Sequence, residues 1–195
     1  MGIARRAAGL AFLRSIGWRL GGERPAPRKY VVIAAPHTSN WDFPITLGCL
    51  AAYDVDVKWV GKHTIFRGPM GPVMKRLGGV PVVRDRSTNF VAQMAGLFEE
   101  HDDFALTMAT EGTRRRVDFW KSGFYHLARL ANVPVVLGYL DYAKKEGGMG
   151  PAIELSGDVT ADMDRVRAFY DGKVGCRPEN FGPIRLRSEV EPEPS

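Results

Sequence analysis

Short apolar runs alternate with helix-like stretches along most of this chain, and this alternation limits the possible folds more than any other feature. The run YVVIAA at residues 30–35 is apolar without interruption, as in a strand buried on both faces. Further strand-like runs lie at residues 57–60, 80–83, 104–108, 133–142 and 153–156. Helix-like stretches lie between them, at 43–53, 68–77, 89–100, 121–131 and 161–171. The pattern predicts an α/β fold in which helices flank a largely parallel sheet.

The chain length of 195 residues is sufficient for one domain with its own hydrophobic core. We predict three parts: a basic helix and linker at residues 1–29, a single domain at 30–187, and a disordered tail at 188–195 that holds three Glu and two Pro. The chain has two cysteines and no CxxC pair, which argues against a disulfide framework or a structural zinc site and favours a reducing compartment.

The N-terminal part is strongly basic. Residues 1–29 hold seven Lys and Arg against one acid, while the whole chain has a net charge of +5. We predict a helix over Met1–Leu20 that ends at Gly21-Gly22. No apolar run approaches the ~18–20 residues of a spanning helix, and arginines interrupt the apolar core that a signal peptide needs. Two alternatives remain for residues 1–20: contact with a membrane surface, or packing on the domain.

The first candidate site joins His37 and Asp42. His37 follows the strand-like run at 30–35, at the carboxyl end where open α/β sheets bind ligands. Asp42 follows five residues later, so both side chains can meet only if the intervening loop folds back onto the first turn of a helix. A carboxylate on one imidazole nitrogen orients the ring and leaves the other nitrogen free to accept a proton from a hydroxyl. A loop histidine bonded to a helix cap is the structural alternative.

Two further groups of residues follow predicted strands. Thr110-Glu111-Gly112-Thr113-Arg114 comes directly after the strand at 104–108 and could bind an anion through its backbone amides and Arg114. Lys62 and Arg84 each follow another predicted strand and could bring positive charge to the same sheet edge, where it would suit a phosphate. Solvated surface charge is the alternative for both groups.

In order along the chain, these pieces resemble the glycerophospholipid acyltransferase family, which includes lysophosphatidic acid acyltransferases. His37 and Asp42 match its His-x4-Asp motif, and the stretch from Lys62 to Gly79-Val-Pro-Val-Val-Arg84 matches its second motif. Thr110–Arg114 corresponds to Pro-Glu-Gly-Thr-Arg, and residues 133–136 to a Val-Pro-Val strand. The order and spacing agree over roughly residues 30–140.

The resemblance implies a glycerol-phosphate acyltransferase-like fold and transfer of an acyl group from acyl-CoA or acyl carrier protein to a lyso-lipid hydroxyl. The first candidate acceptor is 1-acyl-glycerol-3-phosphate. His37 would be the general base and Asp42 its orienting partner, without metal, cofactor or acyl-enzyme. The substrate-binding residues implied are Lys62, Arg84, Glu111, Gly112, Thr113 and Arg114. We also expect peripheral attachment to the cytoplasmic face of the cell membrane through residues 1–20.

The sequence departs from the family pattern near the acceptor-binding motifs. Thr110 replaces the usual Pro, Val83 stands where Asp or Asn is common, and Leu137-Gly138 lacks a further Pro. Another lyso-lipid or lipid-like alcohol therefore remains an alternative acceptor. Other functional alternatives are a thioester hydrolase and a catalytically silent lipid-binding protein. A nucleic-acid-binding module is disfavoured, because the positive charge is concentrated at residues 1–29 and the domain lacks a binding signature.

Overall fold

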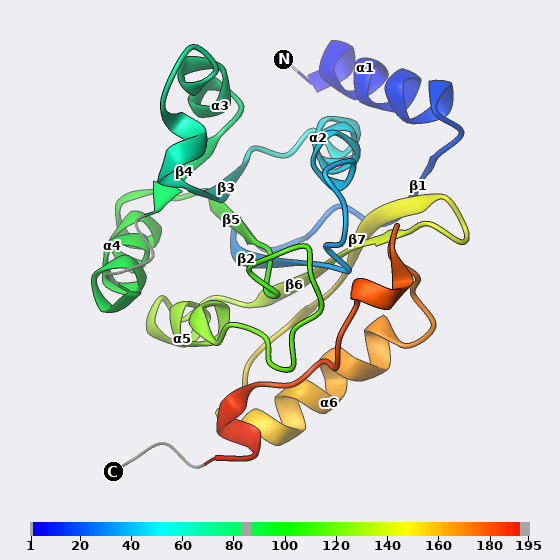
Figure 1. Ribbon diagram of the computed structural model, residues 1–195. Coiled ribbons are helices and arrows are strands. Elements are labelled where there is room, and N and C mark those ends of the chain that lie inside the picture. Colours follow the sequence, from blue (N-terminus) through cyan, green and yellow to red (C-terminus); the bar gives the residue numbers. More distant parts are fainter. Residues whose placement is uncertain (1, 83–86, 192–195) are drawn as a thin grey trace.

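The computed structural model describes residues 2–82 and 87–191, and in this part of the chain seven strands form one sheet (Figure 1). The sheet order is β1-β7-β6-β2-β5-β3-β4, and neighbouring strands are parallel except for β6 and β7. The predicted α/β class with a largely parallel sheet is confirmed. The strands are β1 (Arg19–Gly22), β2 (Lys29–Ala35), β3 (Val57–Lys62), β4 (Gly79–Val82), β5 (Phe104–Met108), β6 (Val135–Asp141) and β7 (Glu146–Ile153).

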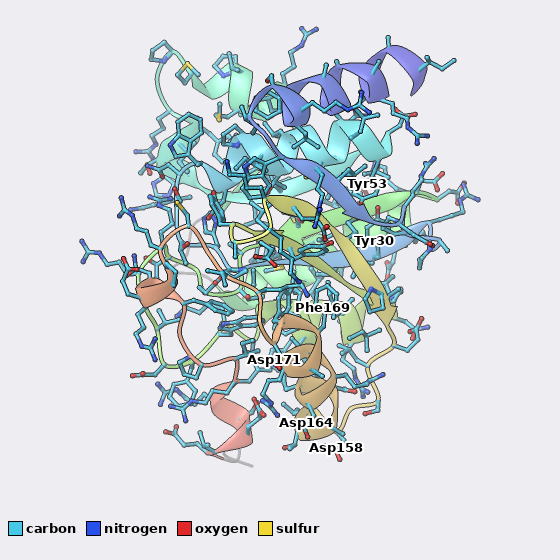
Figure 2. All side chains as sticks on the ribbon, turned by 90° about the vertical axis from the view of Figure 1, so that its right-hand side faces the viewer. Tyr30, Tyr53, Asp158, Asp164, Phe169 and Asp171 are labelled. Carbon is cyan, nitrogen blue, oxygen red and sulfur yellow. The ribbon has the colours of Figure 1, made fainter. Side chains whose placement is uncertain are left out.

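Helices cover both faces of the sheet, because alternate residues of its central strands point to opposite sides. Val31 and Ile33 of β2 face α4, α5 and α6, whereas Val32 faces α2. Figure 1 shows α2 above the sheet with α1 beyond it, and α5 and α6 below. In Figure 2, Tyr53 lies on the upper side and Phe169 on the lower. The helices are α1 (Gly2–Ser15), α2 (Asp42–Tyr53), α3 (Gly71–Arg76), α4 (Ser87–Glu100), α5 (Gly123–Leu130) and α6 (Val159–Tyr170), with short 3-10 helices η1 (His63–Phe66), η2 (Pro178–Asn180) and η3 (Arg187–Glu189).

The predicted N-terminal helix is real but shorter than expected. It ends at Ser15, and Arg19–Gly22 forms the edge strand β1 beside β7. Gly17 adopts a positive φ of 72°, while its amide donates to Arg14 O and the Trp18 amide donates to Leu13 O. This pair of bonds is a Schellman motif, which closes a helix wherever a glycine can take the left-handed conformation. The stop is therefore at Gly17, and the prediction of a helix to Leu20 was wrong.

The helix α1 packs closely against α2. Gly9 is buried, and a Cβ atom at its position would lie 2.5 Å from the Ala52 N atom and 2.7 Å from the Gly48 O atom. The side of α1 that faces away from α2 is exposed, and its Ile3 is 90% accessible to solvent. Thus one side of α1 packs on the domain while the other remains open.

Over residues 2–82 and 87–191, no helix combines the length and apolar character needed to cross a bilayer.

The start of the C-terminal tail is ordered, contrary to the prediction for residues 188–195. Glu189 belongs to η3, its Oε2 accepts a hydrogen bond from the Leu186 amide at 2.6 Å, and its Oε1 lies 2.8 Å from the Arg167 guanidinium. These bonds from Arg167 of α6 and from Leu186, at the start of η3, hold Glu189 in place, which composition alone could not show. Residues 192–195 lie outside the described part of the chain.

Candidate active site

The carboxyl ends of four adjacent parallel strands define the candidate site. β6, β2, β5 and β3 are neighbours and run in one direction, so the segments that follow them lie at one edge of the sheet. These segments contain Tyr142 after β6, His37 after β2, and Glu111 after β5, while Lys62 is the last residue of β3. Topology therefore brings residues that are far apart in the sequence to one edge.

His37 and Asp42 form the centre of this site. The Nδ1 atom of His37 lies 3.1 Å from Asp42 Oδ2, and the side chains are 24% and 4% exposed, respectively. Asp42 is the first residue of α2, and the loop before it folds back, as the spacing required. We assign the proton of the neutral ring to Nδ1, which places the lone pair on the other nitrogen, Nε2. The pair can thus serve as an oriented base.

In the described part of the chain, four hydrogen-bond donors hold Asp42. Besides His37, the backbone amides of Thr38 and Ser39 each donate to Oδ2 at 2.8 Å. The hydroxyl of Tyr142 donates to Oδ1 at 2.6 Å. Burial and this bond to Asp42 raise the pKa of Tyr142 well above its ordinary value, so the phenol remains a donor at neutral pH. The carboxylate is therefore fixed at both oxygens.

Glu111 lies beneath the His37 loop and is 2% exposed. Its Oε1 accepts a hydrogen bond of 2.8 Å from the His37 amide. Among the described residues, no group hydrogen-bonds to its Oε2. Burial raises the pKa of Glu111, while the bond from His37 opposes that rise. The carboxyl group predicted to bind substrate thus supports the backbone of His37.

Most of the other predicted substrate-binding residues follow Glu111 or end β3. Gly112 follows Glu111 with a φ of 67°, partly exposed Thr113 comes next, and Arg114 is exposed. Lys62 is exposed two strands away from β2, which corresponds to roughly 10 Å across a sheet. Arg84 lies outside the described residues.

A small cavity of about 40 Å³ adjoins His37 and Asp42. Its walls come from β2, α2, β5, β6 and β7 and are mostly apolar, with Val32, Leu50 and Met149 among the lining residues. Cys49 also lines the cavity, and burial raises the pKa of its thiol to about 12. A thiol with that pKa is protonated at neutral pH and is a poor nucleophile. The cavity therefore offers an apolar surface rather than a second reactive group.

Sequence reasoning missed Tyr142 as a residue of this site. The available signal was its place at the end of the strand predicted over 133–142, at the same type of strand terminus as His37. Its contact with Asp42 spans 100 residues and depends on β6 lying beside β2. Within the described part of the chain, no group of three or more His, Cys, Asp or Glu side chains is arranged to hold a metal ion.

The fold and site define an α/β protein with a His-Asp pair at the carboxyl edge of its sheet, and comparisons identify the family. A model of the family described as "Acyltransferase" matches residues 18–137. The protein belongs to this acyltransferase family. A comparison with curated proteins found no significant match.

A solved structure shows the same fold. It is the crystal structure of the 1-acyl-sn-glycerophosphate (LPA) acyltransferase PlsC from Thermotoga maritima, with a TM-score of 0.57 and 14% sequence identity. The match covers 85% of this chain and 75% of that one. At this identity the likeness establishes the architecture, and the acceptor has to be argued from the site itself.

Proposed function

We propose that this acyltransferase moves a fatty acyl group from acyl-CoA or acyl carrier protein to a lyso-lipid hydroxyl, with 1-acyl-glycerol-3-phosphate as the first candidate acceptor. The main support is the partly exposed His37 imidazole, whose Nδ1 lies 3.1 Å from the buried carboxylate of Asp42. With Nδ1 directed at Asp42, the lone pair of Nε2 is the one that can accept a proton. The family match adds acyl transfer as the reaction class.

In the proposed reaction, Nε2 of His37 takes the proton from the acceptor hydroxyl as its oxygen attacks the thioester carbonyl. Asp42 stabilises the imidazolium that forms and keeps the ring oriented. The tetrahedral intermediate then collapses, the C–S bond breaks, and the thiolate takes the proton back from His37. The products are an ester and a free thiol, so the protein ends the cycle unchanged.

The acceptor phosphate would lie near Lys62 and Arg114, because both are exposed at the sheet edge that carries His37. Gly112 and Thr113 would complete this binding region through their backbone. Glu111 would act differently from the other residues of its motif, by holding the His37 amide. The apolar cavity beside Asp42 would accommodate acyl carbons next to the thioester.

Membrane contact would come from the outer side of α1. Ile3 is 90% exposed there, while the ring of Phe12 lies against Gly48 of α2 and Arg5 turns inward to donate to Val55 O at 2.9 Å. Apolar side chains beside the remaining arginines suit the surface of an anionic bilayer, where a lyso-lipid acceptor resides.

The experiment is an acyl-transfer assay on purified protein. Labelled acyl-CoA or acyl carrier protein is incubated with lyso-lipids that differ in head group, and product lipid is measured. His37→Ala should lower the rate at least ~100-fold, because a general base contributes about that much or more. Lys62→Ala should raise KM for acceptors that bear a phosphate monoester more than for uncharged acceptors.

His101→Ala is the matched control, since this exposed histidine follows α4, where its Nδ1 lies 3.0 Å from Leu97 O and its ring contacts Phe104. It should keep wild-type activity. Thioester loss without acylated product would instead support a hydrolase. Wild-type protein that leaves every donor and acceptor unchanged would contradict acyl transfer.

A further inference from the structure

We propose that Tyr142 is a positioning residue of the active site, which fixes the Asp42 carboxylate so that His37 is held as a base. The contact that carries this inference is the hydrogen bond of 2.6 Å from the Tyr142 hydroxyl to Asp42 Oδ1. Tyr142 lies beyond residues 18–137, where the family model matches. The role rests on the proposed acyl transfer for its kinetic consequence, but the geometry itself can be tested separately.

The carboxylate needs a restraint at Oδ1. The terminal torsion of an aspartate side chain is broad and roughly two-fold, so the group can rotate at little cost. Oδ2 already receives the Thr38 and Ser39 amides and His37 Nδ1. A donor on Oδ1 prevents rotation about that torsion and keeps Oδ2 in line with the ring. The distance of 2.6 Å is typical of a strong, charge-assisted O–H···O⁻ bond.

Tyr142 is itself held from two sides. Its ring makes an edge-to-face contact with Trp18, with centroids 4.8 Å apart. Its amide donates to Val174 O at 2.8 Å, in the segment that follows α6. The Cys176 thiol of that segment lies beside the Tyr142 hydroxyl. Trp18, which follows α1, and the segment after α6 thus both contact Tyr142. Tyr142 in turn reaches Asp42 from outside the loop that joins His37 to Asp42.

The same C-terminal segment also contacts the His37 loop directly. The Arg177 amide donates to Thr38 Oγ1 at 3.1 Å, and Gly175 is so close that a Cβ there would lie 2.8 Å from that oxygen. These contacts restrain the backbone between His37 and Asp42. Tyr142 is therefore held by packed neighbours. Replacing it with Phe should remove the hydrogen bond to Asp42 and leave the surrounding structure intact.

The first test is Tyr142→Phe in the acyl-transfer assay. We expect kcat to fall about 10-fold to 100-fold, as on loss of a hydrogen bond to a charged group, with little change in KM. Tyr125→Phe is the matched control, because Tyr125 donates to another buried carboxylate, Asp162 Oδ2, at 2.8 Å between α5 and α6. It should keep wild-type kinetics. A Tyr142→Phe enzyme with wild-type kcat would overturn the inference.

The pH profile separates positioning from a loss of folded enzyme. Without the Tyr142 donor, the Asp42 carboxylate holds the imidazolium proton more strongly, so the acid limb of kcat/KM should move up by about half a pH unit or more. In the described part of the chain, the other ionisable groups that contact the pair, line the same cavity or lie beside Tyr142 are Glu111 after β5, Tyr139 of β6, Cys176 in the C-terminal segment and Cys49 of α2. Glu111, Tyr139 and Cys49 have the same surroundings in both proteins, whereas the Cys176 thiol loses its neighbour, so Cys176→Ala in both backgrounds completes the comparison. A lower rate with an unmoved limb would contradict positioning.

A double-mutant cycle then tests whether Tyr142 acts through Asp42. In an Asp42→Asn background, Tyr142→Phe should add less than a twofold loss, since the carboxylate it restrains is gone. Equal losses in both backgrounds would show that Tyr142 acts independently of Asp42 and would overturn the inference.

A spectroscopic measurement makes the inference independent of turnover. The His37 Nδ1 proton, hydrogen-bonded to Asp42, should give a downfield proton NMR resonance. In Tyr142→Phe this resonance should shift, and the proton should exchange faster with water. Tyr125→Phe should leave it unchanged. An unchanged resonance in Tyr142→Phe would refute positioning even if acyl transfer is confirmed. An inactive wild-type protein whose resonance responds as expected would refute the proposed function and leave the positioning role supported.

Discussion

The close contact of α1 with α2 can be tested by replacing Gly9 with valine. A Cβ at Gly9 would lie 2.5, 2.7 and 2.9 Å from backbone atoms of α2, where ordinary contacts begin at 3.4 Å. The helices would have to separate by about 0.5–1 Å, and backbone atoms cannot rotate away as a flexible side chain can. Overpacking of this kind costs about 1–3 kcal/mol and occasionally more. Glycine and valine differ little in helix propensity, so we expect a net loss of about 2–3 kcal/mol.

Ala8→Val is the matched control, because Ala8 is exposed on the same helix and receives the same side chain. It should cost only about 0.5 kcal/mol through propensity. In thermal unfolding followed by circular dichroism, Gly9→Val should lower Tm by about 4–12 °C and Ala8→Val by about 1–2 °C, given about 2–4 °C per kcal/mol at this chain length. Equal Tm values for the two variants would refute close packing of α1 on α2.

Two further predictions concern Glu111 and the outer side of α1. Burial raises the pKa of Glu111, so its contribution to stability is present at low pH and is lost as pH rises through the raised value. Glu111→Gln cannot ionise and keeps an acceptor for His37, so its Tm relative to wild type should rise between pH 4 and 8; a constant difference would contradict the burial argument. Ile3→Asp should weaken binding to anionic vesicles about 10-fold or more, since it removes an exposed apolar side chain, and Ala11→Asp, which adds the same charge to α1, should weaken it less. Equal binding by both variants would show that α1 does not use Ile3 on the membrane.

Much of the architecture could be predicted because buried parallel strands leave a local signal. The apolar run at 30–35 is β2, and the strand predicted over 104–108 matches β5 (Phe104–Met108). The position of Asp42 at the start of a helix also followed from its five-residue spacing to His37. Such features depend on neighbouring residues in the chain, which the sequence displays directly.

The predictions for the end of the N-terminal helix and for the start of the C-terminal tail were wrong, because the local sequence there is compatible with more than one structure. Gly21-Gly22 was predicted to end the N-terminal helix, but Gly17 already supplies the left-handed residue that a Schellman motif needs. The residues after it then gain hydrogen bonds from β7, which lies more than a hundred residues away along the chain. At Glu189, likewise, the partner that orders the tail is Arg167 on α6.

The sequence by itself determined which residues were candidates, because the His-x4-Asp spacing and the strand ends are local. Only the tertiary structure decided how they act together. Glu111 turned under the His37 amide, 74 residues away, and Tyr142 reached Asp42 across 100 residues. The physical reason is that strand order in the sheet places β5 and β6 on either side of β2. That order results from packing of the whole core, and no single segment of the chain specifies it.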